Sequence, residues 1–225
     1  MQPARVASSA ATTGGKRWTA VNEGLADLTV YALAIDPEIP SRLYAGTGRG
    51  LFTTADGGAH WTPGEAFTST VHAVLLDARD PMTIYAGTDD GLYYSPDGGG
   101  VWELAGAATP VQDLAQDETG ALYAATGKGL YRYATPAEAG EQLRFGDVRA
   151  LFIDPEPPGT IYLGTPGGAV FSADKGQSWQ DAGLSGIPVR GLHHIPATRT
   201  LYALTEKGLF RAALPQPPPG ARAST

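Results

Sequence analysis

Three aspartates occur in the same eight-residue pattern and are the first candidates for chemistry. The pattern S/T-x-D-x-G-x-x-W is repeated at Thr54, Asp56, Gly58 and Trp61; at Ser95, Asp97, Gly99 and Trp102; and at Ser172, Asp174, Gly176 and Trp179. General acid–base catalysis needs carboxylates that converge on one pocket. Calcium needs six to eight oxygen ligands, whereas each copy offers one carboxylate.

The same three residue types also suit a tight turn. A carboxylate can accept hydrogen bonds from the backbone of its own hairpin, glycine supplies a positive φ, and tryptophan packs its ring against neighbouring repeats. We therefore interpret these aspartates as structural clamps and expect no catalytic residue among them.

Histidine and cysteine give no support for a metal or redox site. Cysteine is absent, which excludes disulfides, thiolate ligands and cysteine nucleophiles. Of the four histidines, His193 and His194 are adjacent, and neighbours on a strand point to opposite faces. The glycine run Asp97-Gly-Gly-Gly100 belongs to a turn and not to a phosphate-binding loop. We predict no metal and no cofactor.

The charge excludes two classes of partner. A net charge of -7 and an isoelectric point near 5.0 oppose binding to nucleic acid or to anionic lipid. No apolar run approaches the length that crosses a bilayer, so we expect a soluble chain without direct membrane insertion. Whether a signal peptide or further repeats have been removed stays open, as does the oligomeric state.

An internal repeat sets the fold. Tyrosine recurs in one short strand-like segment at Tyr44, Tyr85, Tyr123, Tyr162 and Tyr202, with successive differences of 41, 38, 39 and 40. Each unit begins with an apolar run and continues through the tyrosine segment, a third strand and a fourth that carries the tryptophan. Four antiparallel strands at this period are typical of one propeller blade.

We predict an all-β, five-bladed β-propeller over residues 14–213. The blades are expected at about 30–65, 71–105, 111–145, 148–183 and 189–212. The last blade lacks a fourth strand, and residues 15–21, with Trp18 in the tryptophan position, are predicted to complete it and close the ring. Residues 1–13 and 214–225 are expected to be flexible tails. The alternative is a fragment that needs partner blades from another chain.

Two blades depart from the turn pattern. In the third blade the motif is missing, and Phe145 is expected to replace the tryptophan. In the last blade Thr13 occupies the aspartate position. We expect both of these turns to be looser.

The three motifs at one phase of a repeat resemble the Asp-box (BNR) family over about residues 15–213. That family includes sialidases, sortilin-type receptor propellers, photosystem II stability or assembly factor propellers and xyloglucanase-type propellers. The turns Asp36-Pro-Glu-Ile-Pro and Asp154-Pro-Glu-Pro-Pro are most similar to the last two groups. The resemblance slightly favours an extracytoplasmic location.

The resemblance also allows a test for an enzyme. A sialidase of this family would have an F-R-I-P-type segment, three arginines that grip a carboxylate and a tyrosine nucleophile. No such segment is present, and the five repeat tyrosines are equivalent and fit a core. A xyloglucanase would need two catalytic aspartates and longer loops. We predict that the chain is not an enzyme.

Binding is best sought where equivalent positions differ between blades. The second position of the innermost strand is not the same residue from blade to blade and is expected to ring the channel mouth, with loops on the same face adding charge. Arg149 and Arg190 could clamp a carboxylate or acidic peptide; the alternative is a solvated ring with internal salt bridges. The candidate face consists of Tyr31, His72, Gln112, Arg149, Arg190, Arg49, Asp89, Asp90, Lys128, Glu206 and Lys207.

Three functions remain open from the sequence. The first is a noncatalytic scaffold that binds a protein or peptide or assembles a complex. The second is a carbohydrate-binding or glycoside-hydrolase-like propeller, and the third is a self-assembling structural repeat protein.

Overall fold

A computed structural model describes residues 18–64, 67–106, 109–156 and 159–215. Within these ranges the regular structure consists of β-strands and one short 3-10 turn, η2 (Pro196–Thr198). The strands form five separate antiparallel sheets. The predicted all-β, five-bladed propeller is therefore confirmed. In these residues no helix is long and apolar enough to cross a membrane.

Each blade is a meander in which consecutive strands are neighbours. The first blade contains β1 (Val30–Ile35), β2 (Leu43–Thr47), β3 (Gly50–Thr54) and β4 (Thr62–Pro63). The second contains β5 (Val71–Leu76), β6 (Ile84–Thr88), β7 (Leu92–Ser95) and β8 (Glu103–Leu104). The third contains β9 (Val111–Gln116), β10 (Leu122–Thr126), β11 (Gly129–Tyr133) and β12 (Glu141–Phe145).

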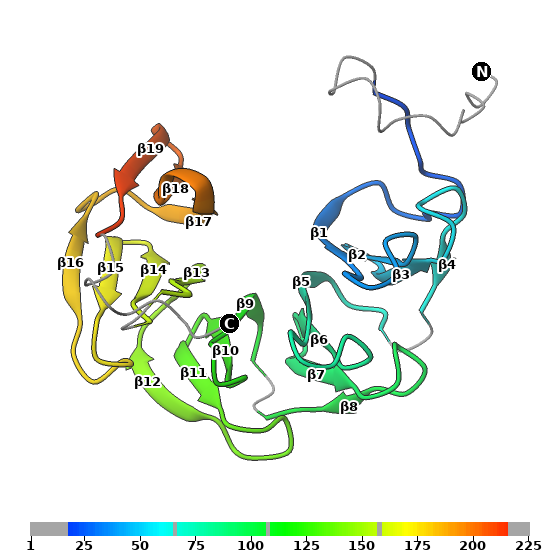
Figure 1. Ribbon diagram of the computed structural model, residues 1–225, viewed down its shortest axis with the longest axis horizontal. Helices are drawn as coiled ribbons and strands as arrows, with labels where there is room; N and C mark the ends of the chain where they lie inside the picture. The colour runs from blue at the N-terminus through cyan, green and yellow to red at the C-terminus, as the bar shows by residue number, and fades with distance from the viewer. Residues whose placement is uncertain (1–17, 65–66, 107–108, 157–158, 216–225) are drawn as a thin grey trace.

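The last two blades differ in strand number. The fourth contains β13 (Ala150–Ile153), β14 (Ile161–Thr165), β15 (Gly168–Ser172) and β16 (Gln180–Gly183). The fifth contains only β17 (Val189–Ile195), β18 (Thr200–Thr205) and β19 (Gly208–Ala213). Figure 1 shows the blades following one another along an open arc, with β1 at one end and β17–β19 at the other.

The hairpin between the second and third strands repeats in every blade. In the first blade, Thr47 donates its hydroxyl hydrogen to the carbonyl of Gly50 over 2.9 Å, and Gly50 has a φ of 108°. A side chain would be strained at that φ, so glycine is needed there. The same bond joins Thr88 to Gly91, Thr126 to Gly129, Thr165 to Gly168 and Thr205 to Gly208.

Adjacent blades lock together through a valine and a glycine. Val71 begins β5 and presses on Gly46 of the first blade, where an added Cβ would lie 2.9 Å from Val71 Cγ1. Val111 lies against Gly87 and Val189 against Gly164 in the same way. These valines are fully buried or nearly so. The apolar start of each innermost strand therefore sets the spacing of the blades.

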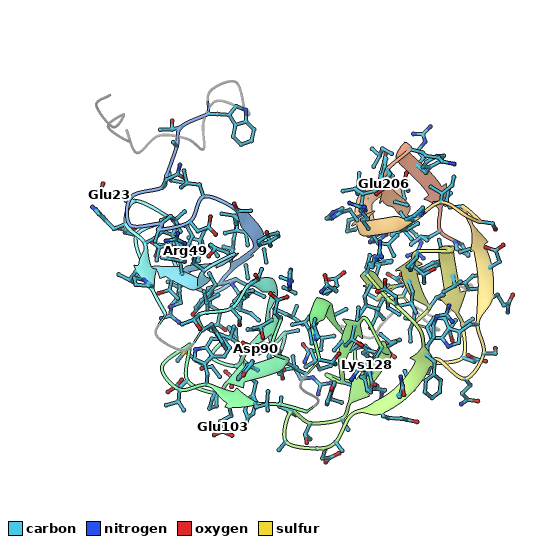
Figure 2. The ribbon with its side chains drawn as sticks, turned by 180° about the vertical axis from the view of Figure 1, so that it is seen from behind. Glu23, Arg49, Asp90, Glu103, Lys128 and Glu206 are labelled. Carbon is cyan, nitrogen blue, oxygen red and sulfur yellow. The ribbon has the colours of Figure 1, made fainter. Side chains whose placement is uncertain are left out.

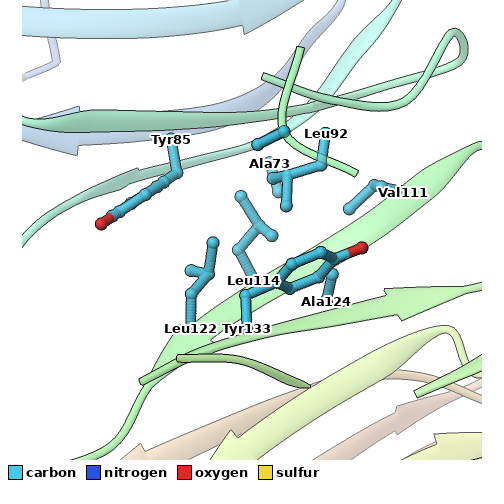
Figure 3. Close-up of a cluster of buried hydrophobic side chains, with 9 residues drawn as sticks. Ala73, Tyr85, Leu92, Val111, Leu114, Leu122, Ala124 and Tyr133 are labelled. Atoms are coloured by element: carbon cyan, nitrogen blue, oxygen red, sulfur yellow. The ribbon is translucent and has the colours of Figure 1, made fainter. Parts of the chain in front are cut away.

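An aromatic ring fills the wedge-shaped space between two adjacent blades in each of the first three pairs. Trp102 packs beside Phe67 between the first and second blades, and Trp179 packs against the third blade from the fourth. Between the second and third blades the ring is Tyr133, as Figure 3 shows. Phe145 was expected to replace the missing tryptophan there, and that expectation is wrong because its side chain is 79% exposed.

The two ends of the chain differ from the expected closed ring. Residues 18–21 form no strand, and Trp18 is 91% exposed. Residues 15–17 and 1–13 lie outside the described residues, so the structure does not show the predicted strand 15–21 paired with β19. At the other end Leu214, predicted to begin a tail, is buried and donates its N–H to the Arg199 carbonyl over 2.8 Å.

Candidate functional site

In four of the blades the variable position of the innermost strand lies at a β-bulge, and in the fourth blade Arg149 directly precedes β13. The pairing of β1 with β2 passes from Val30 opposite Thr47 to Ala32 opposite Gly46, so that Tyr31 is left without a partner residue. His72, Gln112 and Arg190 are skipped in the same way in their blades. A bulge turns the extra side chain away from the regular alternation of the strand. It therefore frees these residues from packing between blades.

These side chains line one cavity at the centre of the arc. Its volume is about 540 Å³, and Tyr31, His72, Gln112, Arg149 and Arg190 all contribute to its wall. The structure thus brings together the five residues of this variable position. Asp147 lines the same cavity and was missed by the sequence analysis.

The loop residues of the candidate face do not line this cavity. Figure 2 shows Arg49, Asp90, Lys128 and Glu206 spread along the arc over the first, second, third and fifth blades. The wall includes none of Arg49, Asp89, Asp90, Lys128, Glu206 and Lys207. Asp89 and Glu206 instead contact residues of the wall.

Each basic residue of the cavity wall has a carboxylate beside it. His72 Nε2 lies 2.7 Å from Asp89 Oδ1, and Arg149 Nε donates to Asp147 Oδ2 over 2.9 Å. Arg190 pairs with Glu206. The hydrogen bond from His72 holds the pKa of Asp89 below its usual value.

The ring of Tyr31 meets that of His72 edge to face with centroids 5.5 Å apart. Its side chain is half exposed. The cavity mouth therefore combines alternating charges with one aromatic surface.

Asp113 is a second residue that the sequence analysis missed. It follows Gln112 directly. The equivalent residue in three other blades is alanine, at Ala32, Ala73 and Ala150. Its carboxylate accepts the N–H of Leu114 over 2.9 Å and that of Leu151 in the next blade over 2.8 Å. Burial raises the pKa of Asp113 to about 6. This carboxyl links the third blade to the fourth.

The Asp-box aspartates are occupied by their own turns. Thr54 donates its hydroxyl hydrogen to Asp56 Oδ1 over 2.7 Å, and the His60 N–H reaches the same oxygen over 2.9 Å. Gly58, which has a φ of 91°, donates its N–H to the Thr54 hydroxyl. Ser95 with Asp97, and Ser172 with Asp174, repeat the arrangement.

These bonds stabilise the charged carboxylates. They lower the pKa of both Asp56 and Asp97. For Asp56, the hydrogen bond from Thr54 has the largest effect on the pKa. The bonds from Ser178 lower the pKa of Asp174 to about 2. A carboxylate held ionised in this way is a turn clamp and a poor proton donor.

The repeat tyrosines are parts of the blade packing. Tyr44, Tyr85 and Tyr123 are buried, and burial raises the pKa of each hydroxyl. Tyr85 donates its hydroxyl hydrogen to Asp77 over 3.0 Å, and Tyr123 donates to Asp117 over 3.1 Å.

The two adjacent histidines do not share a site. The ring of His194 packs at a tilt against Phe152 of the fourth blade with centroids 4.7 Å apart, whereas His193 is exposed. Across the described part of the chain, no group of three His, Cys, Asp or Glu side chains could hold a metal ion.

Comparison with known proteins supports the fold. No family model and no curated protein matches the chain. Among solved structures, the GH74 enzyme of Niastella koreensis is 19% identical with a TM-score of 0.67, over 80% of this chain and 35% of that one. An ancestral GH74 enzyme is 21% identical with a TM-score of 0.70, over 84% and 28%.

Two further structures belong to other classes of protein. The extracellular domain of BT4673 from B. thetaiotaomicron is 16% identical with a TM-score of 0.67, over 81% of this chain and 27% of that one. YCF48 bound to D1 peptide is 14% identical with a TM-score of 0.58, over 82% and 63%. The chain spans less than two thirds of the length of each of these neighbours. It is thus a β-propeller similar in structure to the propellers of GH74, BT4673 and Ycf48.

Proposed function

We propose that this chain is a noncatalytic propeller that binds an acidic segment of a protein at the central cavity. One observation carries the proposal: the five positions that are equivalent by repeat present four different residue types, and all five side chains line one cavity of about 540 Å³. Packing demands the same residue in every blade, whereas a ligand does not.

The charges of the cavity favour a carboxylate ligand. Arg149 and Arg190 lie on adjacent blades, and a guanidinium can bind a carboxylate through two parallel hydrogen bonds. Their present partners, Asp147 and Glu206, are one third to more than one half exposed. Exposed ion pairs are worth about 0–1 kcal/mol. A ligand carboxylate could therefore replace such a partner at little cost.

A neighbour in structure supports a peptide as the ligand. YCF48 was solved bound to D1 peptide, and it shares the propeller fold of this chain. The Asp-box carboxylates are held by their own turns, which supports a noncatalytic role. We also propose a location outside the cytoplasm, because BT4673 is matched through its extracellular domain.

Carbohydrate binding is the second candidate function. The half-exposed ring of Tyr31 at the cavity mouth offers a surface on which a sugar could stack, and the GH74 neighbours are enzymes. A panel of fluorogenic glycosides tests for turnover. Hydrolysis that one substitution in the cavity abolishes would replace the noncatalytic proposal.

The test of the peptide proposal compares two double variants of equal charge. Arg149→Ala with Arg190→Ala removes two cations from the cavity, and Arg79→Ala with Lys175→Ala removes two from the opposite face. Immobilised wild type and both variants are probed with one library of acidic and amide-capped neutral peptides. We expect the wild type and the control to retain acidic peptides and the cavity variant to lose them.

Two results would contradict the proposal. Equal retention by all three proteins would show that binding does not use this cavity. Equal loss in both variants would show that net charge alone attracts the peptides. Circular dichroism of each protein establishes that the fold is intact.

A further inference from the structure

The wedge between the fourth and fifth blades contains a cavity where the other wedges contain an aromatic ring. It has a volume of about 320 Å³, and its wall is mostly apolar, with Tyr162, Ala169 and Ala182 from the fourth blade. Leu192, Leu201 and Phe210 line it from the fifth. Trp102, Tyr133 and Trp179 fill the three preceding wedges.

The wall matches the residues that surround Trp179. That indole packs against a cluster that includes Tyr123, Leu130 and Leu143 of the third blade and Leu151, Ile161 and Val170 of the fourth. One blade later, the same places are taken by Tyr162, Ala169, Ala182, Leu192, Leu201 and Phe210. The cavity therefore lies where the fifth blade would place a tryptophan side chain, and β17–β19 supply none.

The described N-terminal residues lie in the register of a fourth strand. Trp61 Nε1 donates to the Val21 carbonyl over 2.8 Å, as Trp179 Nε1 donates to the Leu143 carbonyl of the blade before it over 3.3 Å. Val21 stands three residues after Trp18, and Ala182 stands three after Trp179. Val21 therefore lies beside the first blade in the way that Leu143, from the fourth strand of the third blade, lies beside the fourth blade.

At the two ends of the arc, apolar side chains on the faces of the first and fifth blades are exposed to solvent. Val30 is 46% exposed and Leu33 is 57% exposed, whereas their equivalents Val148 and Leu151 of the fourth blade are 0% and 5% exposed. On the fifth blade, Leu209 is 64% exposed. Apolar side chains of this kind gain free energy when two faces come together.

We propose that residues 18–21 of this same chain add to β19 as its fourth strand and insert Trp18 into the cavity between the fourth and fifth blades. The pairing of the other blades gives the register. Thr53 lies opposite Thr62, and Tyr94 lies opposite Glu103, so Thr19 is placed opposite Arg211. The first and fifth blades approach each other in this state, and the ring closes.

Closure of the ring also accounts for an unusual residue in the fifth blade. The position that receives the valine of the next blade is glycine or alanine in four blades and Leu204 in the fifth. Leu204 lies over Gly191, which has no side chain, and is 40% exposed. In the closed ring Val30 packs on the Leu204 side chain, so this seam is wider than the others.

A disulfide tests the register directly, because the chain has no cysteine. Opposed residues of antiparallel strands have Cα atoms about 4.5–5.5 Å apart, within the range a disulfide spans. The test pair is Thr19→Cys with Arg211→Cys. The control pair is Thr19→Cys with Ala212→Cys, whose side chains point to opposite faces. Both are oxidised in dilute solution and measured by non-reducing electrophoresis and intact mass.

We expect a cross-linked monomer from the test pair and free thiols from the control pair. A cross-linked dimer would overturn closure within one chain and show that a second copy supplies the strand. Absence of cross-linking above the control would overturn the strand addition itself. Neither result bears on the peptide cavity.

Melting temperature gives an independent measurement on the indole. Trp18→Ala is expected to lower it by roughly 10 °C, from the usual cost of truncating a buried tryptophan in a domain of this size. Trp18→Phe should lower it less, because an aromatic ring still enters the cavity. If neither variant changes the melting temperature, Trp18 does not occupy the cavity.

Discussion

Asp113→Asn is expected to remove a pH dependence of stability that the wild type shows between about pH 4 and pH 6. Asp113 is partly buried, and its carboxyl lies between the third and fourth blades and accepts the N–H groups of Leu114 and Leu151. Burial disfavours its charge and raises its pKa from 3.8 to about 6. Asparagine keeps the shape of the side chain but cannot ionise.

The sign and size follow from proton linkage. Between pH 3.8 and about 6, the folded protein holds a proton on Asp113 that the unfolded chain has released. The free energy of unfolding therefore decreases as the pH rises through this interval and is level above it. Two pH units at about 1.4 kcal/mol each give about 3 kcal/mol. The variant also loses one acceptor, a roughly 1–3 kcal/mol cost that does not change with pH.

Urea denaturation of both proteins at intervals from pH 4 to pH 7 isolates the effect. The advantage of the wild type over the variant should shrink by about 3 kcal/mol across this range. Groups other than Asp113 titrate in both proteins and cancel in the difference. A difference that is constant across the range would refute the reasoning, because Asp113 would then have the same pKa in the folded and unfolded states.

Three further changes test other parts of the fold. Gly99→Ala places a side chain at a φ of 101° and should cost about 1 kcal/mol in urea denaturation, whereas Gly127→Ala, which meets open space, should cost less. The pKa of Asp174 is lowered from 3.8 to about 2, so its stabilisation is present above pH 3.8 and lost as the pH falls toward 2. Asp174→Asn should flatten the melting temperature profile in that window. Arg199→Gln leaves the nearly buried Asp154 carboxylate without its ion pair and should cost roughly 3 kcal/mol, measured by calorimetry.

The blade architecture could be predicted because packing repeats residue types. Each blade needs an apolar first strand, a tyrosine strand and a Thr-x-x-Gly hairpin, and these recur at a nearly constant period. The aromatic ring between the second and third blades could not be predicted in the same way. Tyr133, at the end of β11, fills the wedge and Phe145 points to solvent, because the third blade lacks the Asp-box turn that fixes the tryptophan.

The candidate site was predictable only in part. Comparison of equivalent positions identified Tyr31, His72 and the two arginines. The same comparison would have identified Asp113, which replaces an alanine of three other blades. Asp147 is two residues before Arg149, and residues so spaced lie on one side of an extended chain, which was a usable signal. The bulge itself is a property of strand pairing, which no single strand sequence specifies.

The bulge separates stability from recognition in this propeller. Val71 at the start of β5 presses on Gly46 and cannot change without loss of contact between blades. His72 follows it directly, yet the bulge directs its side chain into the central cavity and away from the core. One residue of each pair is therefore fixed by packing while its neighbour is free to differ from blade to blade. Under the proposed binding role, such a propeller could change its ligand without changing its fold, which is why the differences between blades at this one position, and not the repeated carboxylates, are the place to seek function.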